Sequence, residues 1–184
     1  MKLVVGIGNP GRRYEGTRHN VGFDVIETLG RADGIDVRRK RFDALIGEGR
    51  IRDVPVVLMK PQTFVNVTGK AVRPALDFWK LSPDDVLVVC DDANIELGRL
   101  RIRRGGSSGG HRGLESIETH LGTDAYPRLR IGIGRRGEDL VDHVLGRFSK
   151  AERQVMDETI IDAARAVGVW LVGGIDVCMN EFNG

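Results

Sequence analysis

The sequence has little of several features that would assign it at once to a class of protein. It has only two cysteines, Cys90 and Cys178, which excludes a disulfide framework and predicts a reducing, cytoplasmic compartment. No apolar run reaches the roughly 18 residues that a membrane helix needs, so we expect no membrane partner. Aromatic residues are only 5% of the chain, which argues against a surface that stacks on single-stranded bases. The formal net charge of +2 by itself indicates no partner.

The composition that remains is that of an ordinary folded protein. Hydrophobic residues make up 41% and charged residues 29% of 184 residues, which excludes general disorder. At this length we expect a single domain over residues 1–184, with a helical C-terminal part from about 140 to 184. Glycine is the outlier, because 25 residues are about twice the usual share.

Apolar patterns along the chain alternate between strand and helix. Residues 2–7, 85–90 and 128–134 are typical of buried strands, residues 42–51 and 54–59 of a hairpin, and residues 97–104 of a half-exposed strand. Helical spacing begins after Asn20, a candidate cap, and recurs at residues 68–80, 114–121 and 140–172. We expect Pro74 to kink the helix at 68–80 or to mark its start. This alternation predicts an α/β protein, a three-layer α/β/α domain around a twisted, mixed and largely parallel sheet.

A glycine motif after the first strand raises one alternative function. Residues 6–11, GIGNPG, match the G-x-G-x-x-G pattern of dinucleotide-binding proteins. That site also needs a helix that opens at the third glycine and an acidic residue after a second apolar strand. The polar stretch 12–20 and the basic stretch 35–43 supply neither. A dinucleotide-dependent oxidoreductase therefore stays a minor alternative.

Among the four histidines, His19 has the most suggestive surroundings. It lies in a polar loop after the first strand, and Asp91 and Asp92 end the strand at 85–90. Functional loops of α/β sheets lie at the carboxyl ends of strands, where a carboxylate can orient an imidazole. Turn formation and helix capping are the structural alternative for the two aspartates. A hydrolase built on this pair would use water activated by a general base, since neither a serine elbow nor a metal-ligand spacing occurs.

Two asparagines are further candidates for the site. Asn9 and Asn66 carry neutral amides, which donate and accept hydrogen bonds and suit contact with a peptide backbone or a water molecule. Each also has a structural interpretation, Asn9 as a turn residue before Pro10 and Asn66 as a residue that leads into a helix.

Taken together, these segments resemble the bacterial peptidyl-tRNA hydrolase family. The matching stretches are VVGIGNPGRRYEGTRHNVGFDVI (4–26), LMKPQTFVNVTGKAV (58–72), VLVVCDDANIELGRLRIRRGGSSGGHRGLESI (86–117), YPRLRIGIGR (126–135) and VDHVLGRFS (141–149). The resemblance implies hydrolysis of the ester that joins a peptide to the 3′ ribose of tRNA, by a cofactor-free, metal-free enzyme that acts as a monomer. The partner it implies is the acceptor stem and 3′ end of peptidyl-tRNA.

The resemblance also assigns roles to single residues. It implies His19 as the general base, Asp91 as the residue that orients it, and Asn9 as a further catalytic residue. Asn9 and Asn66 would bind the peptide and help to exclude aminoacyl-tRNA with a free amine. Residues that would contact the substrate cleft or the tRNA phosphates are Tyr14, Phe64, Arg103, Arg112 and Arg130.

The chain departs from the family pattern at a few positions. Arg112 stands where the family often has an asparagine that positions water or substrate, and Val65 where a methionine is common. Near Asp91 the chain has Cys90 in place of the usual histidine and Asn94 in place of a later aspartate. A non-catalytic RNA-binding relative with the same fold is therefore the alternative function.

The net charge conceals two oppositely charged stretches. Residues 99–136 contain nine arginines and three acids, a charge of +6, whereas residues 137–184 contain four bases and nine acids, a charge of −5. Arginine binds phosphate through two parallel hydrogen bonds, which lysine cannot form. A solvated strand face is the structural alternative for part of the first stretch, but the pattern favours phosphate binding. We expect recognition of a tRNA backbone that weakens steeply with salt.

Overall fold

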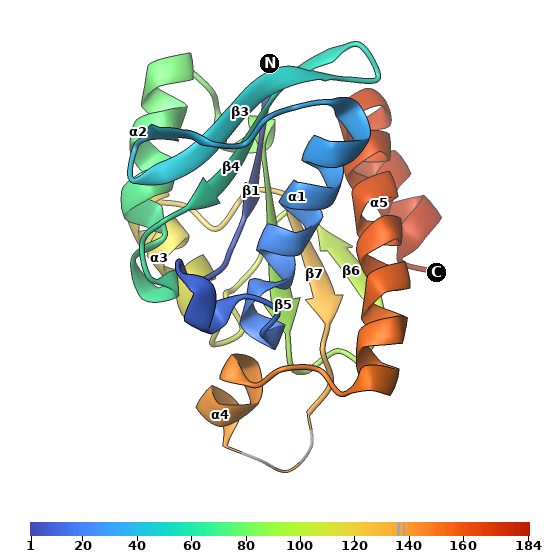
Figure 1. The fold of residues 1–184 in the computed structure, drawn as a ribbon. Coiled ribbons are helices and arrows are strands. Elements are labelled where there is room, and N and C mark those ends of the chain that lie inside the picture. The colour runs from blue at the N-terminus through green and yellow to red at the C-terminus, as the bar shows by residue number, and fades with distance from the viewer. Residues whose placement is uncertain (136, 138) are drawn as a thin grey trace.

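The computed structural model describes residues 1–135, 137 and 139–184, and within them the chain forms one seven-stranded sheet (Figure 1). The order across the sheet is β2-β3-β4-β1-β5-β7-β6. The strands are β1 (Lys2–Gly6), β2 (Arg39–Arg41), β3 (Ala44–Ile51), β4 (Val54–Pro61), β5 (Val86–Asp92), β6 (Leu100–Arg103) and β7 (Arg128–Gly132). The predicted α/β class with a mixed sheet is confirmed.

The parallel strands occupy the middle of the sheet. Strand β1 pairs in parallel with β4 and β5, and β5 pairs in parallel with β7. The outer pairings, β2 with β3, β3 with β4 and β6 with β7, are antiparallel. Because the four parallel strands run in one direction, the loops that follow β4, β1, β5 and β7 leave the sheet at the same edge.

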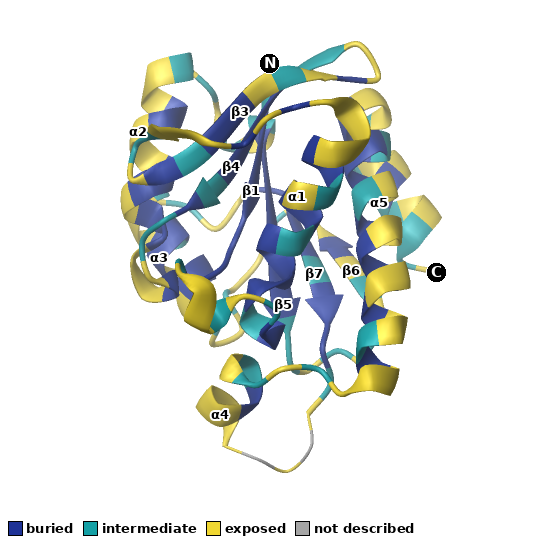
Figure 2. Cartoon of the chain, viewed as in Figure 1, coloured by how far each residue is buried: buried dark blue, intermediate teal, exposed yellow. Residues whose placement is uncertain are grey.

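Helices cover both faces of the sheet and complete the three layers (Figure 1). They are α1 (Val21–Asp33), α2 (Gly69–Trp79), α3 (Arg112–Leu121), α4 (Leu140–Leu145) and α5 (Lys150–Phe182), with short 3-10 turns at Arg12–Tyr14, Arg18–Asn20, Val65–Val67 and Pro83–Asp85. One buried cluster joins the sheet to α1 and α5, and a second joins it to α2 and α3. The four parallel strands in the middle of the sheet are buried at most of their residues (Figure 2), as central parallel strands should be. None of the described helices is long and apolar enough to cross a membrane.

Several local predictions differ from the structure. Asn20 precedes α1, but its side chain does not cap the helix, since both of its amide atoms bond the backbone of Asn9. Pro74 lies within α2, which begins at Gly69, so Pro74 does not mark the start of the helix. The C-terminal helical part divides into α4 and α5, and α5 extends beyond 172 to Phe182, with non-helical backbone at Gly174. The stretch 35–43, where we expect no apolar strand, contains the short and largely exposed strand β2, which the sequence pattern did not predict and which consists of three basic residues.

A close contact between backbones seats α1 on the sheet. A Cβ on Gly22, in the first turn of α1, would lie 2.5 Å from the backbone nitrogen of Ile7 and 2.6 Å from the carbonyl oxygen of Val89. A Cβ on Gly6 would lie 2.2 Å from the carbonyl oxygen of Gly22. The absence of side chains at both positions lets the helix approach β1 and β5 closely. This contact holds the turn that precedes α1 next to the end of β5.

We predict that Gly22→Ala destabilises the protein by roughly 1–3 kcal/mol or more, because backbone atoms cannot move aside for the new methyl group. The measurement is urea denaturation followed by circular dichroism. Gly173→Ala is the matched control, since Gly173 is helical and exposed and the atoms nearest to its added Cβ belong to the side chain of Val177, at 3.1–3.4 Å, and not to the backbone. Equal free energies of unfolding for wild type and Gly22→Ala would contradict the close contact.

Candidate active site

A cleft of about 550 Å³ lies at the edge of the sheet where the parallel strands end. Its wall includes residues from the loops after β1, β4 and β5, from the glycine-rich loop at 105–110, from β7 and from α4. Among the lining residues are His19, Asn9, Asp91 and His111. The position is that expected for a functional site on a parallel sheet.

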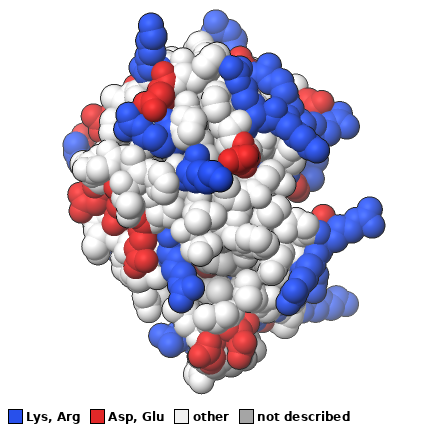
Figure 3. Space-filling model, turned by 90° about the vertical axis from the view of Figure 1, so that its left-hand side faces the viewer, with Lys and Arg blue, Asp and Glu red and all other residues white. Residues whose placement is uncertain are grey.

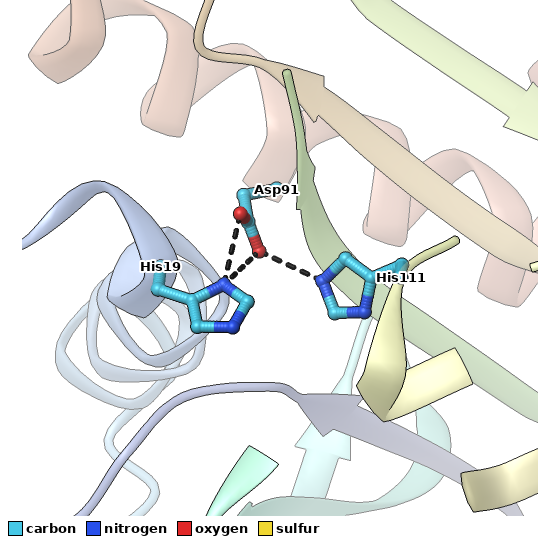
Figure 4. A group of neighbouring side chains, drawn as sticks. All are labelled: His19, Asp91 and His111. Atoms are coloured by element: carbon cyan, nitrogen blue, oxygen red, sulfur yellow. Dashed lines mark hydrogen bonds and ion pairs between the residues drawn. The ribbon is translucent and has the colours of Figure 1, made fainter. Parts of the chain in front are cut away.

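At the base of the cleft, one carboxylate lies between two imidazoles (Figure 4). His19 Nδ1 is 2.8 and 2.9 Å from the two carboxylate oxygens of Asp91, and His111 Nε2 is 2.9 Å from Oδ1 of the same group. Asp91 is 2% exposed. A carboxylate so deeply buried requires donors, and the two rings provide them.

The hydrogen bonds determine which ring nitrogens carry protons. His111 lies at the N-cap of α3, where its Nδ1 accepts from the backbone N–H groups of Gly113 and Leu114. Its proton is therefore on Nε2, which donates to Asp91. In neutral His19 it is Nδ1 that carries the proton, because Nδ1 faces the carboxylate of Asp91 and a carboxylate can only accept a hydrogen bond. The Nε2 atom of His19 is then unprotonated and available as a base.

Burial and charge act in opposite directions on the two titrating groups. Burial alone would lower the pKa of His19, but the charge and hydrogen bond of Asp91 outweigh burial and raise this pKa above the ordinary 6.5. Burial alone would raise the pKa of Asp91, and the two imidazoles instead hold it far below its usual range. Asp91 is thus ionised at neutral pH, and His19 accepts a proton more readily than an isolated histidine.

The same three side chains are the cluster, among the described residues, that could hold a metal ion. Their candidate ligand atoms all lie within 4.8 Å of one another. A metal on His111 Nε2 would require the ring proton to be on Nδ1, where it would face the N–H groups of Gly113 and Leu114. The hydrogen bonds of the helix cap therefore fit a proton on Nε2 better than a metal.

Asn9 is held from two sides beside this group. Its backbone N–H donates to Asn20 and its backbone carbonyl accepts from the same side chain, at 2.8 and 2.9 Å. Its side-chain oxygen accepts from the backbone N–H of Val65 at 3.0 Å. With the oxygen so engaged, the side-chain NH₂ is the donor that Asn9 brings to the cleft.

Comparisons with known proteins agree on one family. The family model described as peptidyl-tRNA hydrolase matches residues 3–184. The curated peptidyl-tRNA hydrolases of Caldanaerobacter subterraneus subsp. tengcongensis and Thermoanaerobacter sp. (strain X514) are 50% and 47% identical, with all of both chains covered. The crystal structure of the peptidyl-tRNA hydrolase from Acinetobacter baumannii superposes with a TM-score of 0.94 at 36% identity, over 100% of this chain and 95% of that one.

The chain belongs to the peptidyl-tRNA hydrolase family. It is an enzyme, and its reaction is the hydrolysis of peptidyl-tRNA. The dinucleotide alternative does not agree with the structure, because α1 begins at Val21, ten residues after Gly11, and the third glycine of the motif opens no long helix. The alternative of a non-catalytic RNA-binding relative does not agree with the names of the curated homologues, which are peptidyl-tRNA hydrolases along their whole length.

The residues expected at a peptidyl-tRNA hydrolase site do not all lie in the cleft. Seven of them line it: His19, Asp91, Asn9, Phe64, Asn66, Arg112 and Arg130. Tyr14 lies outside the lining but against Phe64, with ring centroids 6.4 Å apart in an edge-on arrangement. Arg103 is exposed on β6, outside the cleft lining. It can therefore contact only a ligand that extends beyond the cleft.

Sequence reasoning did not assign roles to two parts of the peptidyl-tRNA hydrolase site. The first is His111, although its place in the loop GGHRG, just before a helix, is a usable signal for a functional or capping residue. The second is α4, which brings an apolar wall to the cleft, made by Leu140, Val141, Val144 and Leu145. The spacing of its apolar residues predicts only an amphipathic helix, since neighbouring residues in the sequence do not indicate that these side chains line a cleft.

We predict that Asp91→Asn lowers kcat for peptidyl-tRNA by roughly 10²–10⁴-fold, because an amide no longer fixes the tautomer of His19. Loss of the charge also leaves burial as the main influence on the pKa of His19, so this pKa falls. The acid limb of the kcat/KM profile should therefore move to lower pH. Asp92→Asn is the control for the limb, because it removes one charge without contacting His19. An acid limb that stays in place in Asp91→Asn would contradict the pairing.

Proposed function

We propose that His19 is the general base of peptidyl-tRNA hydrolysis. A water molecule in the cleft gives its proton to Nε2 of His19 and attacks the carbonyl carbon of the ester. The tetrahedral intermediate then expels the 3′ ribose oxygen, which takes the proton from Nε2 of the His19 imidazolium and so restores the neutral base. The observation that carries the proposal is the bond from His19 Nδ1 to buried Asp91, which leaves Nε2 basic and stabilises the imidazolium that forms.

The amides near His19 support a role in substrate binding and polarisation. The NH₂ group of Asn9 is a donor whose position is held by Val65 and Asn20. A donor placed in advance stabilises the oxyanion of the intermediate without the cost of reorganisation. Asn66 is exposed in the turn Val65–Val67 and lines the cleft, where it can bind the peptide backbone. An ester is more reactive than an amide, so one oriented base with such donors suffices.

The basic residues support a binding site for the tRNA backbone next to the cleft. Arg130 is fixed by Asp92 and by the carbonyl oxygen of Ser107, at 3.3 and 2.7 Å. Arg103 and Arg112 are exposed and have no ion-pair partner among the described residues, so both can pair with phosphate. Figure 3 shows, on one face of the molecule, several separate groups of basic side chains, with acidic side chains between them, along the left edge and near the lower end. We infer that the acceptor stem meets a local positive charge that the net charge conceals.

We further propose that the enzyme acts as a monomer, without metal or other cofactor, on the acceptor stem and 3′ end of peptidyl-tRNA. The cleft contains a base, its orienting carboxylate and amide donors from a single chain. Hydrolysis of an ester needs no further group, and the cap on His111 favours a proton over a metal.

We predict that His19→Ala lowers kcat for an N-blocked aminoacyl-tRNA by roughly 10²–10⁴-fold, the share that general base catalysis supplies. Release of the blocked amino acid is followed by acid precipitation of the labelled tRNA ester. His120→Ala is the matched control, because His120 is exposed on α3 and bonds the carbonyl oxygen of Ser116 outside the cleft. Equal rates for wild type and His19→Ala would refute the assignment of the base.

We predict that Arg112→Gln raises KM several-fold, leaves the acid limb of the pH profile in place, and lowers the slope of log(kcat/KM) against log[salt] by about one unit. The physical reason is the loss of one phosphate contact. Arg165→Gln on α5 is the control, since it makes the same charge change where ion pairs to Asp162 and Glu181 occupy the guanidinium. A salt slope equal to that of wild type would show that Arg112 contacts no phosphate.

A further inference from the structure

Arg18, the residue before the proposed base His19, is buried. Arg18 is 8% exposed, although arginine is seldom buried unless paired. Its guanidinium donates to the carbonyl oxygen of His143 at 3.1 Å and pairs with Glu152 at 3.4 Å. It also lies over the ring of Phe148, 5.4 Å from the centroid. All three partners belong to the segment from α4 to the start of α5.

The backbone makes the same connection. The N–H of Arg18 donates to the carbonyl oxygen of Gly146 at 2.9 Å, and Thr17 forms a bridge with Arg147. The turn Arg18–Asn20, which carries His19, is therefore bonded to the segment that follows α4 by both main chain and side chain. The same α4 supplies the apolar wall of the cleft.

Glu152, the partner of Arg18 on α5, is itself held in place by hydrogen bonds. Glu152 is 7% exposed and is the N3 residue of α5, where its carboxylate accepts from the backbone N–H of Ser149 at 3.0 Å while the Ser149 hydroxyl accepts from the N–H of Glu152. Such a capping box fixes the first turn of the helix. Arg18 thus joins the turn with the base to the capped end of the longest helix of the fold.

Stability alone is a weak reason for this arrangement. A buried ion pair often contributes little net free energy, because desolvation of the two charges offsets their attraction. The pair instead fixes a geometry. The planar guanidinium can bond the carbonyl oxygen of His143 and the carboxylate of Glu152 together only when the turn Arg18–Asn20 has one position relative to α4 and α5.

We propose that Arg18 is a positioning residue for the reaction. It fixes the turn that carries His19 against the C-terminal end of α4, so that Nε2 of the base and the apolar wall of the cleft keep one relative position. The inference rests on the proposed role of His19 and deepens it. Arg18 contacts neither substrate nor reacting atoms, and it acts on kcat through the placement of the base.

The first test is Arg18→Met, which keeps the stem and removes the guanidinium. We expect kcat to fall by roughly 10–100-fold with KM within about threefold of wild type, because misplacement of a base by about 1 Å costs on the order of 10² in rate. Arg18→Lys keeps the charge towards Glu152 but not the fork, and should recover part of kcat. Both parameters are measured on the same N-blocked aminoacyl-tRNA.

Arg153→Met is the matched control for lost stability. Arg153 also ties α5 to another helix, through Asp24 of α1 at 3.2 Å, and lies 5.9 Å from the ring centroid of Phe148, but among the described residues it bonds none in the turn that carries His19. We expect Arg153→Met to lower the melting temperature as Arg18→Met does and to leave kcat within about twofold of wild type, since the geometry of the base is unchanged. A kcat for Arg18→Met as high as that of Arg153→Met would overturn the proposal, and so would a loss seen only in KM.

A second variant moves the guanidinium without removing it. Gly146 has an ordinary φ of −78°, and an added Cβ would lie 2.7 Å from Nη1 of Arg18, closer than to the carbonyl oxygens of Asp142 and His143 at 3.2 and 3.4 Å. Gly146→Ala should therefore lower kcat more in the wild-type background than in Arg18→Met, where the closest of these contacts is absent and the two carbonyl contacts remain. Equal effects of Gly146→Ala in both backgrounds would show that it does not act through Arg18.

The outcomes separate this inference from the proposed function. If His19→Ala is as active as wild type, the assignment of the base fails, whatever the Arg18 variants do. If His19→Ala is inactive and Arg18→Met keeps full kcat, His19 remains the base and only the positioning role is refuted.

Discussion

The arrangement of the site depends on one buried negative charge. Asp91 lies at the end of a central strand with 2% of its surface exposed, and a carboxylate in such a place is stable only with donors around it. It receives them from His19, before α1, and from His111, at the start of α3. The need to satisfy this charge therefore brings two distant loops together. The same bonds leave Nε2 of His19 basic, so the bonds that satisfy the buried charge also supply what the proposed general base requires.

The sheet makes this meeting possible. The parallel strands β1 and β5 are neighbours, so the loops that follow them leave the sheet side by side. Glycines at positions 6 and 22 let α1 lie directly on these strands, which brings the turn with His19 down to the level of Asp91. Bulkier residues there would push the helix away from the sheet and lengthen the bond between His19 and Asp91. The close contact of backbones in the core thus has a direct consequence for the chemistry.

The cleft brings together regions suited to the two parts of a peptidyl-tRNA. One wall, from α4, is apolar, and near it the amides of Asn9 and Asn66 suit a peptide backbone. Arginines of β7 and of the start of α3 suit phosphate, and Arg103 lies farther out on β6. His19 also lines this cleft, as the proposed base must if it acts on the ester that joins the two parts. Charge separation along the chain places positive groups in and near the cleft, where we propose that the tRNA backbone binds, while the net charge stays close to zero.

Local sequence determined much of this protein. Apolar periodicity predicted the central strands and most of the helices, because these signals depend on neighbours in the chain. The polar residues after two strands pointed to His19 and Asp91, whose side chains meet in the cleft. Resemblance to the family supplied the reaction. Only the tertiary structure decided that Asp91 has a second donor in His111, that Arg18 is buried against α5, that Asn20 holds Asn9 instead of capping α1, and that Arg103 lies outside the cleft. Each of these depends on which side chains meet after the strands have paired, and a pattern of neighbours along the chain does not contain that information.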